Sequence, residues 1–296
     1  MKRVPRKNII MEIPLLKDIL QPLKDRILKR RWLKYIWGNP SRPIKEGMVN
    51  VYYFKWKNQD NVGDLLSEIT VDFVKEKLNL KDTKKDKTIR MFAIGSVIHA
   101  ARSEMVIWGS GIRNSITQPP KVKFDIRAVR GPLTRKRMME NGYDCPAIYG
   151  DPALLLPLFY NPKIEKKYDY TIIPHYYKEN DVPDQYKGKM MSTFTSDWRG
   201  FIDRIIASEY VVSSSLHGLI LAEVYGVPAI LYDVESDVYK YEDYFQGTGR
   251  TNIPIAESLE FAIQNKPSAP PIQGIEKIQS DLLGAFPKDL WYQFKG

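Results

Sequence analysis

Two hydrophobic patterns alternate along most of the chain. Short apolar runs rich in β-branched and aromatic residues are typical of buried strands, whereas apolar residues recurring every three or four positions indicate helices packed on a sheet. The predicted strands are 49–54, 89–94, 105–108, 124–129, 147–149, 170–173, 210–212 and 228–232. The predicted helices are 65–78, 132–141, 198–207, 217–225 and 275–283. This alternation predicts an α/β fold with parallel sheets and crossover helices.

The pattern lapses near residues 160–167 into Asn-Pro and a run of charges, which predicts a domain boundary. We therefore expect two Rossmann-like domains, 48–160 and 161–296, the second ending in the helix near 275–283. Two such domains face each other across a cleft at the carboxyl ends of their strands, where ligands usually bind. Polar segments that directly follow the predicted strands should line this cleft.

Residues 1–47 form a separate, basic segment. Apolar residues recur with helical spacing from Ile9 to Ile27, and Pro14 and Pro22 predict two short helices, the second about 22–37. Of the formal net charge of +10, this segment holds 13 Lys and Arg against 4 acidic residues, and the rest of the chain holds 32 against 31. A basic helix with Leu and Trp suits an anionic lipid surface, but its apolar stripe could equally pack on the body. A nucleic-acid arm is a third interpretation.

The composition and the absence of several motifs exclude some classes of protein. With 43% hydrophobic and 27% charged residues the chain is globular, and its apolar runs are too short to span a bilayer. No signal peptide is expected at its start. The single cysteine, Cys145, excludes a disulfide framework and a thiolate metal cluster. There is no Asp-x-Asp triplet, zinc-type His pair, Gly-x-Gly-x-x-Gly or P-loop motif, so we expect no metal ion and no bound cofactor.

Several candidate residues follow the strands of the first half. Gly63 permits a tight turn after Asn61, and Asp64 can either cap the following helix or face the cleft. Ser110 and Gly111 are small enough for backbone amides to approach a ligand.

The second half adds a Ser-rich helix start. Ser214, Ser215, His217 and Gly218 follow a buried strand, and a helix N-terminus of this kind favours an anion. Arg130, at a strand end of the first half, could offer its guanidinium to a carboxylate or phosphate, or pair with an acid at the surface.

The two remaining histidines also follow predicted strands. His175 is either a polar wall residue or an acid/base group, whereas His99 is more typical of a structural histidine.

Six motifs occur in an order that is specific as a set, although each alone is common. They are Asn61-Val62-Gly63-Asp64, Gly109-Ser110-Gly111-Ile112, Arg130-Gly131-Pro132-Leu133-Thr134, Gly150-Asp151-Pro152-Ala153-Leu154-Leu155, Ile173-Pro174-His175-Tyr176, and Ser213–Gly218 with Gly226-Val227-Pro228. Over roughly residues 49–250, which include Lys240-Tyr241-Glu242-Asp243-Tyr244, the chain therefore resembles the polysaccharide pyruvyl transferase family.

The resemblance implies a glycosyltransferase-B-like fold and transfer of pyruvate from phosphoenolpyruvate to two hydroxyls of a sugar, as a cyclic ketal. It implies Arg130 and His217 as donor-site residues, and Asp151 and Lys240 as further substrate-binding residues. His217 is then the candidate acid for the methylene carbon of the donor, and Asp64, from the acceptor-side domain, the candidate base.

The donor carries about three negative charges near neutrality, so it needs paired anion holders. Arg130 on one domain and Ser214, Ser215 and the helix N-terminus on the other would clamp it. The acceptor would be a glycan of a surface or exopolysaccharide precursor, free or lipid-linked, and residues 1–47 would hold the enzyme on the inner, cytoplasmic face of the cell membrane. We expect no nucleic-acid partner.

Two other functions fit the same pattern. A glycosyltransferase using a nucleotide sugar would place its diphosphate at the same helix N-terminus. A non-catalytic scaffold would use the basic segment to bind a membrane.

Overall fold

The computed structural model describes residues 48–57, 59–81, 88–232, 237–267 and 272–293. The basic segment 1–47 lies outside these residues, so its two helices and its lipid-binding or packing role stay predictions.

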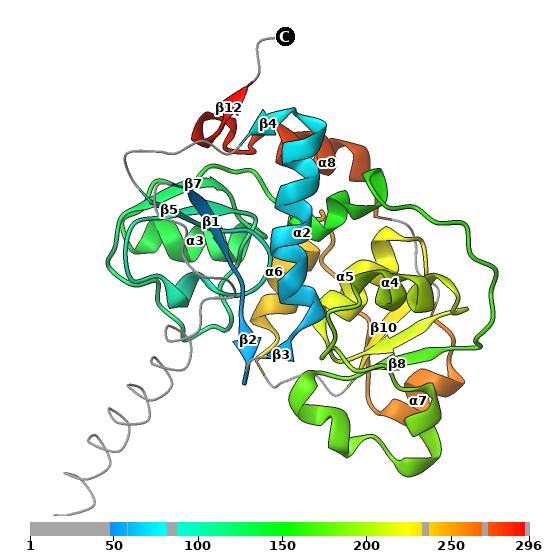
Figure 1. Cartoon of the computed structure of the whole chain (residues 1–296). Helices are drawn as coiled ribbons and strands as arrows, with labels where there is room; N and C mark the ends of the chain where they lie inside the picture. The colour runs from blue at the N-terminus through cyan, green and yellow to red at the C-terminus, as the bar shows by residue number, and fades with distance from the viewer. Residues whose placement is uncertain (1–47, 58, 82–87, 233–236, 268–271, 294–296) are drawn as a thin grey trace, which may run out of the picture. The chain divides into compact units, whose positions relative to one another are not determined.

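The first half of the described chain forms a four-stranded parallel sheet with the order β1-β5-β6-β7 (Figure 1). Its strands are β1 (Val49–Tyr52), β5 (Ile89–Phe92), β6 (Met105–Trp108) and β7 (Phe124–Ala128), and its helices are α2 (Val62–Lys77) and α3 (Pro132–Glu140). The expected strand 147–149 is reduced to a single parallel bridge between Val129 and Tyr149. The bridge is followed at once by Gly150, with φ 141°, and by the Pro152 that starts a 3-10 turn, so the strand cannot continue.

The second half forms another four-stranded parallel sheet, with the order β11-β10-β9-β8. The strands are β8 (Thr171–Ile173), β9 (Val211–Ser213), β10 (Ala229–Tyr232) and β11 (Ile255–Ala256), and the helices are α4 (Trp198–Ile206), α5 (Leu216–Val224) and α7 (Leu259–Gln264). Strands β8, β9 and β10 are buried along their whole length, as the unbroken apolar runs in the sequence predict. The mixed α/β class with parallel sheets is therefore confirmed.

Three further elements connect the two sheets: η2 (Pro152–Leu158), α6 (Tyr239–Gly247) and α8 (Ile275–Gly284). Helices α2 and α5 both pack on η2, and α6 packs on α3 (Figure 1). Helix α8 packs on the first sheet, where Trp108 Nε1 donates a hydrogen bond to the Leu282 carbonyl at 2.8 Å, and its Ile275 and Ile278 also pack on the core cluster that contains residues of strands β9 and β10. Its assignment to the second domain stays a prediction. The division into domains 48–160 and 161–296 stays a prediction.

Several short elements complete the described chain. They are β2 (Lys55–Trp56), β3 (Gln59–Asp60), β4 (Leu80–Lys81), η1 (Ile98–Ala100), η3 (Tyr176–Asp181), η4 (Asp184–Lys189), η5 (Lys288–Leu290) and β12 (Tyr292–Gln293). The hairpin β2–β3 matters for the site because it leads directly into α2.

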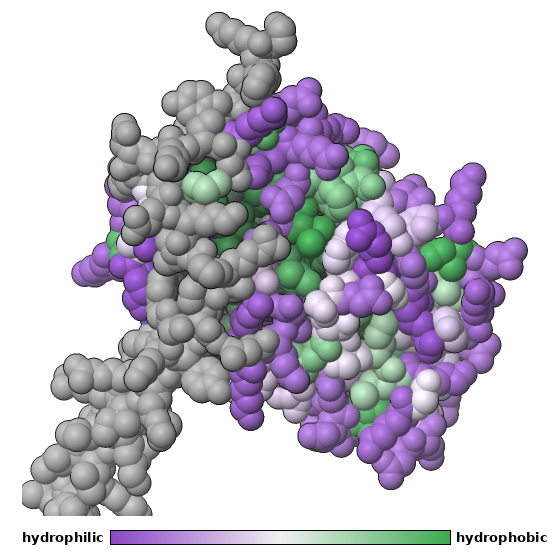
Figure 2. Space-filling view, in the orientation of Figure 1, coloured by the Kyte–Doolittle hydropathy of each residue, from purple (hydrophilic) through white to green (hydrophobic). Residues whose placement is uncertain are grey.

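The surface in Figure 2 is uneven: hydrophobic surface gathers near the middle of this face, where Figure 1 places α2, and hydrophilic surface covers much of the rest. Within the described parts of the chain, no helix combines the length and apolar character needed to cross a bilayer.

Candidate functional site

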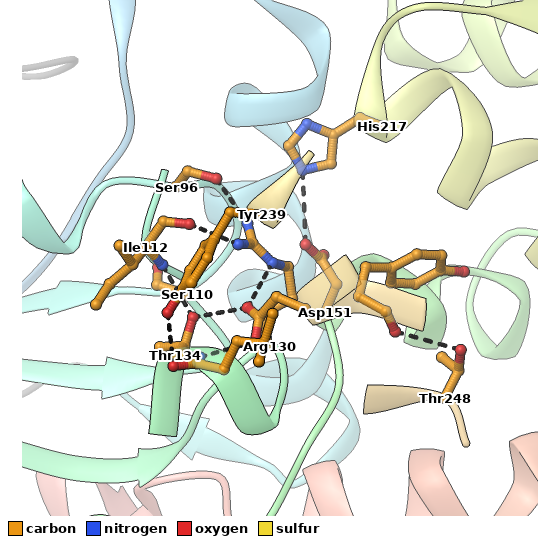
Figure 3. A network of polar contacts seen from close by, with 12 residues as sticks. Ser96, Ser110, Ile112, Arg130, Thr134, Asp151, His217, Tyr239 and Thr248 are labelled. Carbon is orange, nitrogen blue, oxygen red and sulfur yellow. Dashed lines mark hydrogen bonds and ion pairs between the residues drawn. The ribbon is translucent and has the colours of Figure 1, made fainter. Parts of the chain in front are cut away.

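His217 and Asp151 form the centre of the candidate site. Strand β9 ends at Ser213, Ser215 caps α5 by accepting a hydrogen bond from the Gly218 amide, and His217 lies in the first helical turn. Its Nε2 atom lies 3.6 Å from Oδ2 of Asp151, whose other oxygen accepts a hydrogen bond from the Ala153 amide (Figure 3). Neither Nε2 nor Oδ2 has a hydrogen-bond partner among the described residues, so the two atoms face each other as an imidazole–carboxylate pair.

Gly63 brings α2 against the His217 ring. A Cβ atom at position 63 would lie 2.2 Å from His217 Nδ1, which is well inside van der Waals contact. Only glycine therefore allows α2 to approach the ring this closely. This contact explains the glycine at position 63 better than the tight turn that the sequence predicted.

Asp64 follows within the same turn of α2. Burial raises the pKa of its carboxyl group to about 6, the charge of His217 lowers it and the charge of Asp151 raises it further. The structure does not make Asp64 the helix cap, because Asn61 occupies that position. Two carboxyl groups and one imidazole thus interact at one place, and one of the carboxyl groups titrates near neutrality.

Asn61 fixes the start of α2 to the second half. It makes no side-chain cap bond; its Nδ2 atom donates to Thr193 Oγ1 at 3.1 Å, and the Val62 amide donates to the Thr193 carbonyl at 2.8 Å. These bonds hold Gly63 and Asp64 against α5.

His175 lies beside this centre in its neutral form. Its backbone amide donates to Ser214 Oγ at 2.9 Å. Burial, followed by the charges of Lys240 and Arg113, lowers its pKa to about 3. A neutral imidazole fits a polar wall residue, and both interpretations of His175 from sequence stay predictions.

Lys240 and Arg113 supply positive charge around His175. The Lys240 side chain, on α6, is largely buried, and its Nζ lies 4.9 Å from the centre of the Tyr241 ring. Arg113 also lowers the pKa of His99, which burial brings to about 4, so His99 is neutral too. Arg113 was not among the residues predicted from sequence, although it directly follows the Gly109–Ile112 motif.

Arg130 does not present its guanidinium to solvent. The side chain is fully buried and donates through Nε to Asp243, through Nη1 to Ser96 and through Nη2 to the Ile112 carbonyl, at 3.0, 2.6 and 2.7 Å (Figure 3). Arg130 is therefore paired with an acid, as one of the two interpretations from sequence expects, but the pair is buried and not at the surface. Its role as a donor-site residue stays a prediction.

Asp243 belongs to the Lys240–Tyr244 motif, but no role was predicted for it from sequence. Its carboxylate accepts bonds from Arg130, from the Thr134 amide at 2.8 Å and from Thr134 Oγ1 at 2.6 Å. It thereby joins α6 to the end of β7 and the start of α3. The available signal was its spacing of three from Lys240, which places both residues on one face of a helix.

The predicted small residues shape the backbone. Ser110 donates to the Ala93 carbonyl, and a Cβ at Gly111 would lie 2.3 Å from Arg130 Cζ. Ser214 and Ser215 are buried and hydrogen-bonded to backbone amides, so their hydroxyls order the turn before α5. A Cβ at Gly218 would lie 2.5 Å from Ser213 Oγ, so this glycine also serves a close approach.

An imidazole, two carboxyl groups and buried cations lie close together on this α/β fold, as in the active site of an enzyme. Comparison with known families shows which class of protein this is. The family model described as polysaccharide pyruvyl transferase matches residues 61–236, more than half of the chain. The protein belongs to this family, as the sequence resemblance implied. The match contains every residue of the site described above except Lys240, Tyr241 and Asp243.

Two relatives add detail. The chain is 28% identical over 172 residues to an uncharacterized protein of Acanthamoeba polyphaga mimivirus, and equally so to the succinoglycan biosynthesis protein ExoV of Rhizobium meliloti (strain 1021). Each alignment covers 53% of this chain, and they cover 59% and 52% of those two proteins. The chain thus spans about half the length of the curated relatives it matches.

Proposed function

We propose that the protein transfers pyruvate from phosphoenolpyruvate to two hydroxyls of a sugar in a surface or exopolysaccharide precursor. The products are a cyclic ketal and phosphate. The observation that carries this proposal is the convergence of His217, Asp151 and Asp64 within the segment that matches the pyruvyl transferase family. The name of the relative ExoV, a succinoglycan biosynthesis protein, supports a polysaccharide acceptor.

Lys240 and Arg113 are the residues we assign to the anionic donor. Phosphoenolpyruvate carries a carboxylate and a phosphate, together about three negative charges near pH 7. Both cations act electrostatically on His175, and the N-terminus of α5 adds the positive end of its dipole. Arg130 is already bonded to protein acceptors, so we assign it a positioning role: it holds Ser96 and the Ile112 carbonyl in place.

His217 supplies the proton that activates the donor. In our scheme it protonates the methylene carbon of phosphoenolpyruvate, which makes the neighbouring C2 electrophilic. Asp151, 3.6 Å from Nε2, stabilises the protonated imidazole before the transfer.

Asp64 takes the proton of the attacking sugar hydroxyl. The oxygen bonds to C2, the C2–O bond to phosphate then breaks, and Asp64 returns its proton to the leaving phosphate. The second hydroxyl closes the ketal on C2 and its proton restores His217. The donor is a substrate here, and the scheme uses no metal ion and no bound cofactor.

Phosphate release tests the proposal directly. The full chain is incubated with phosphoenolpyruvate and a panel of β-galactosides, β-glucosides and mannosides, and the pyruvyl ketal is detected by mass. His217→Ala should lower turnover by about 10²–10⁴-fold, the usual contribution of a general acid. Near wild-type turnover in this variant would remove His217 from the mechanism.

Ligand-dependent stabilisation separates this function from a nucleotide-sugar glycosyltransferase. A rise in the unfolding temperature with phosphoenolpyruvate, but not with UDP or GDP, is expected for a pyruvyl transferase. The reverse pattern would overturn the proposal.

A further inference from the structure

Six aromatic side chains gather beside the candidate site. This aromatic cluster consists of Phe54, Trp56, His175, Tyr176, Tyr177 and Phe194. It combines three segments that are far apart in sequence: the start of the β2–β3 hairpin, the 3-10 helix η3 with the residue before it, and the loop before α4.

The rings form a continuous group centred on Tyr176. Its ring centre lies 5.7 Å from that of Trp56 and 5.4 Å from that of Phe194, both in tilted arrangements. His175 continues the group, with its ring centre 4.5 Å from Tyr176 and 4.0 Å from Tyr177.

The backbone ties the cluster to the acid/base residues. The hairpin that carries Trp56 runs directly into Asn61, and Asn61 bonds to Thr193, the residue before Phe194. Two residues after Asn61, Gly63 contacts the His217 ring. The cluster therefore borders the same turn that positions His217 and Asp64.

Partial exposure distinguishes the cluster from the packed aromatic core of the same molecule. Trp108, Phe286 and Trp291, whose rings also contact one another, are all buried at 6% exposure or less. In the aromatic cluster no ring belongs to a fully buried residue, and Tyr177 is 42% exposed. These rings therefore keep surface that another molecule can contact.

We propose that the aromatic cluster is the acceptor subsite, where a pyranose ring of the glycan stacks before it is pyruvylated. This inference rests on the proposed function. The face of an aromatic ring carries partial negative charge and attracts the polarised C–H groups of a sugar, while a flat apolar face suits the C–H side of the pyranose. Tyrosine hydroxyls at the rim can bond to the sugar hydroxyls. A sugar held there would lie beside the turn of α2 that carries Asp64, the proposed base.

Binding of simple glycosides tests this subsite without requiring turnover. Methyl β-galactoside, methyl β-glucoside and methyl α-mannoside are titrated onto the full chain, with saturation-transfer NMR used to identify the sugar protons in contact with aromatic rings. At least one glycoside should bind through its C–H face. Trp56→Leu and Tyr177→Ala should each weaken it by roughly tenfold, and Trp56→Phe should retain most of the affinity.

Phe261→Ala is the matched control, because Phe261 is also 42% exposed but lies on α7, outside the cluster. It should leave glycoside binding unchanged. Equal binding in all four variants, or binding by none of the three glycosides, would overturn the acceptor subsite.

Stabilisation by phosphoenolpyruvate is measured in the same variants. If wild type is not stabilised by phosphoenolpyruvate but its glycoside binding depends on Trp56 and Tyr177, the proposed donor fails and the sugar subsite stands. If phosphoenolpyruvate stabilises every variant equally, but no glycoside binds or all four variants bind it equally, only the proposed acceptor subsite is wrong.

Discussion

Replacing Asp64 by Asn should change both the stability and the pH dependence of the protein. Burial raises the pKa of this carboxyl group from 3.8 to about 6. The folded state therefore binds a proton more tightly than the unfolded state, and the free energy of unfolding falls as pH rises from about 4 to about 6 and levels off above that.

The size of the effect follows from the pKa difference. Two units correspond to about 3 kcal/mol, because each unit is worth 1.36 kcal/mol. Asp64 keeps some solvent contact, so we expect a measured gain for Asp64→Asn of about 1–3 kcal/mol at pH 7.5 and a negligible gain at pH 4. Urea unfolding of both proteins at the two pH values provides the measurement.

Asp72→Asn controls for the loss of a negative charge, because Asp72 is an exposed residue of the same helix. It should produce no gain that grows with pH. A stability difference between Asp64→Asn and wild type that is the same at pH 4 and pH 7.5 would refute the reasoning.

Activity gives the second half of this prediction. If Asp64 is the base, kcat/KM for the sugar should rise with pH through about 6 as the carboxylate forms. Asp64→Asn should lower kcat/KM by about 10²-fold or more, and kcat/KM should no longer rise with pH in this range. A variant within a few-fold of wild type would assign the base to another residue.

Three other changes test separate parts of the structure. Asp243→Ala leaves the buried Arg130 charge unpaired and should lower the free energy of unfolding by about 3–5 kcal/mol in urea; a loss below about 1 kcal/mol would contradict the buried pair. Gly63→Ala forces a Cβ to within 2.2 Å of His217 and should reduce turnover while circular dichroism stays native, whereas unchanged turnover would show that the ring moves freely. Deleting residues 1–47 should abolish sedimentation with anionic vesicles and spare transfer to a soluble sugar; steeply salt-dependent duplex binding by the full chain would instead favour a nucleic-acid arm.

The parallel sheets could be predicted from sequence because their strands are short, continuous apolar runs. Buried β8, β9 and β10 carry this signal over their whole length. Helix α6 could not be predicted in the same way. Its aromatic and charged residues follow no simple apolar stripe, because its buried residues face both α3 and the core cluster of the second half.

The site was predictable to the extent that its residues follow strands. His217, Asp64 and Asp151 come together because three such loops converge, which the order of strands and helices implies. The partner of Arg130 was not predictable, because Asp243 is 113 residues away in sequence and reaches it through the packing of α6 on α3. The sequence shows that Arg130 follows a strand, but it does not show which acceptors its guanidinium contacts.

The state of each charged group follows from its immediate surroundings and not from the composition of the chain. Outside residues 1–47 the protein is nearly neutral, with 32 basic and 31 acidic residues, so bulk attraction supplies little to an anionic substrate. Asp243 pairs with Arg130, and the charges of Lys240 and Arg113 help burial to keep His175 neutral. The positive charge of these two residues would favour binding of a trianionic donor next to His217, and it disfavours protonation of His175. The positive charge of Lys240 and Arg113 thus explains both the uncharged state of His175 and the proposed binding of an anionic donor. Lys240→Met should therefore weaken donor binding and raise the pKa of His175, which NMR titration of its ring protons can detect.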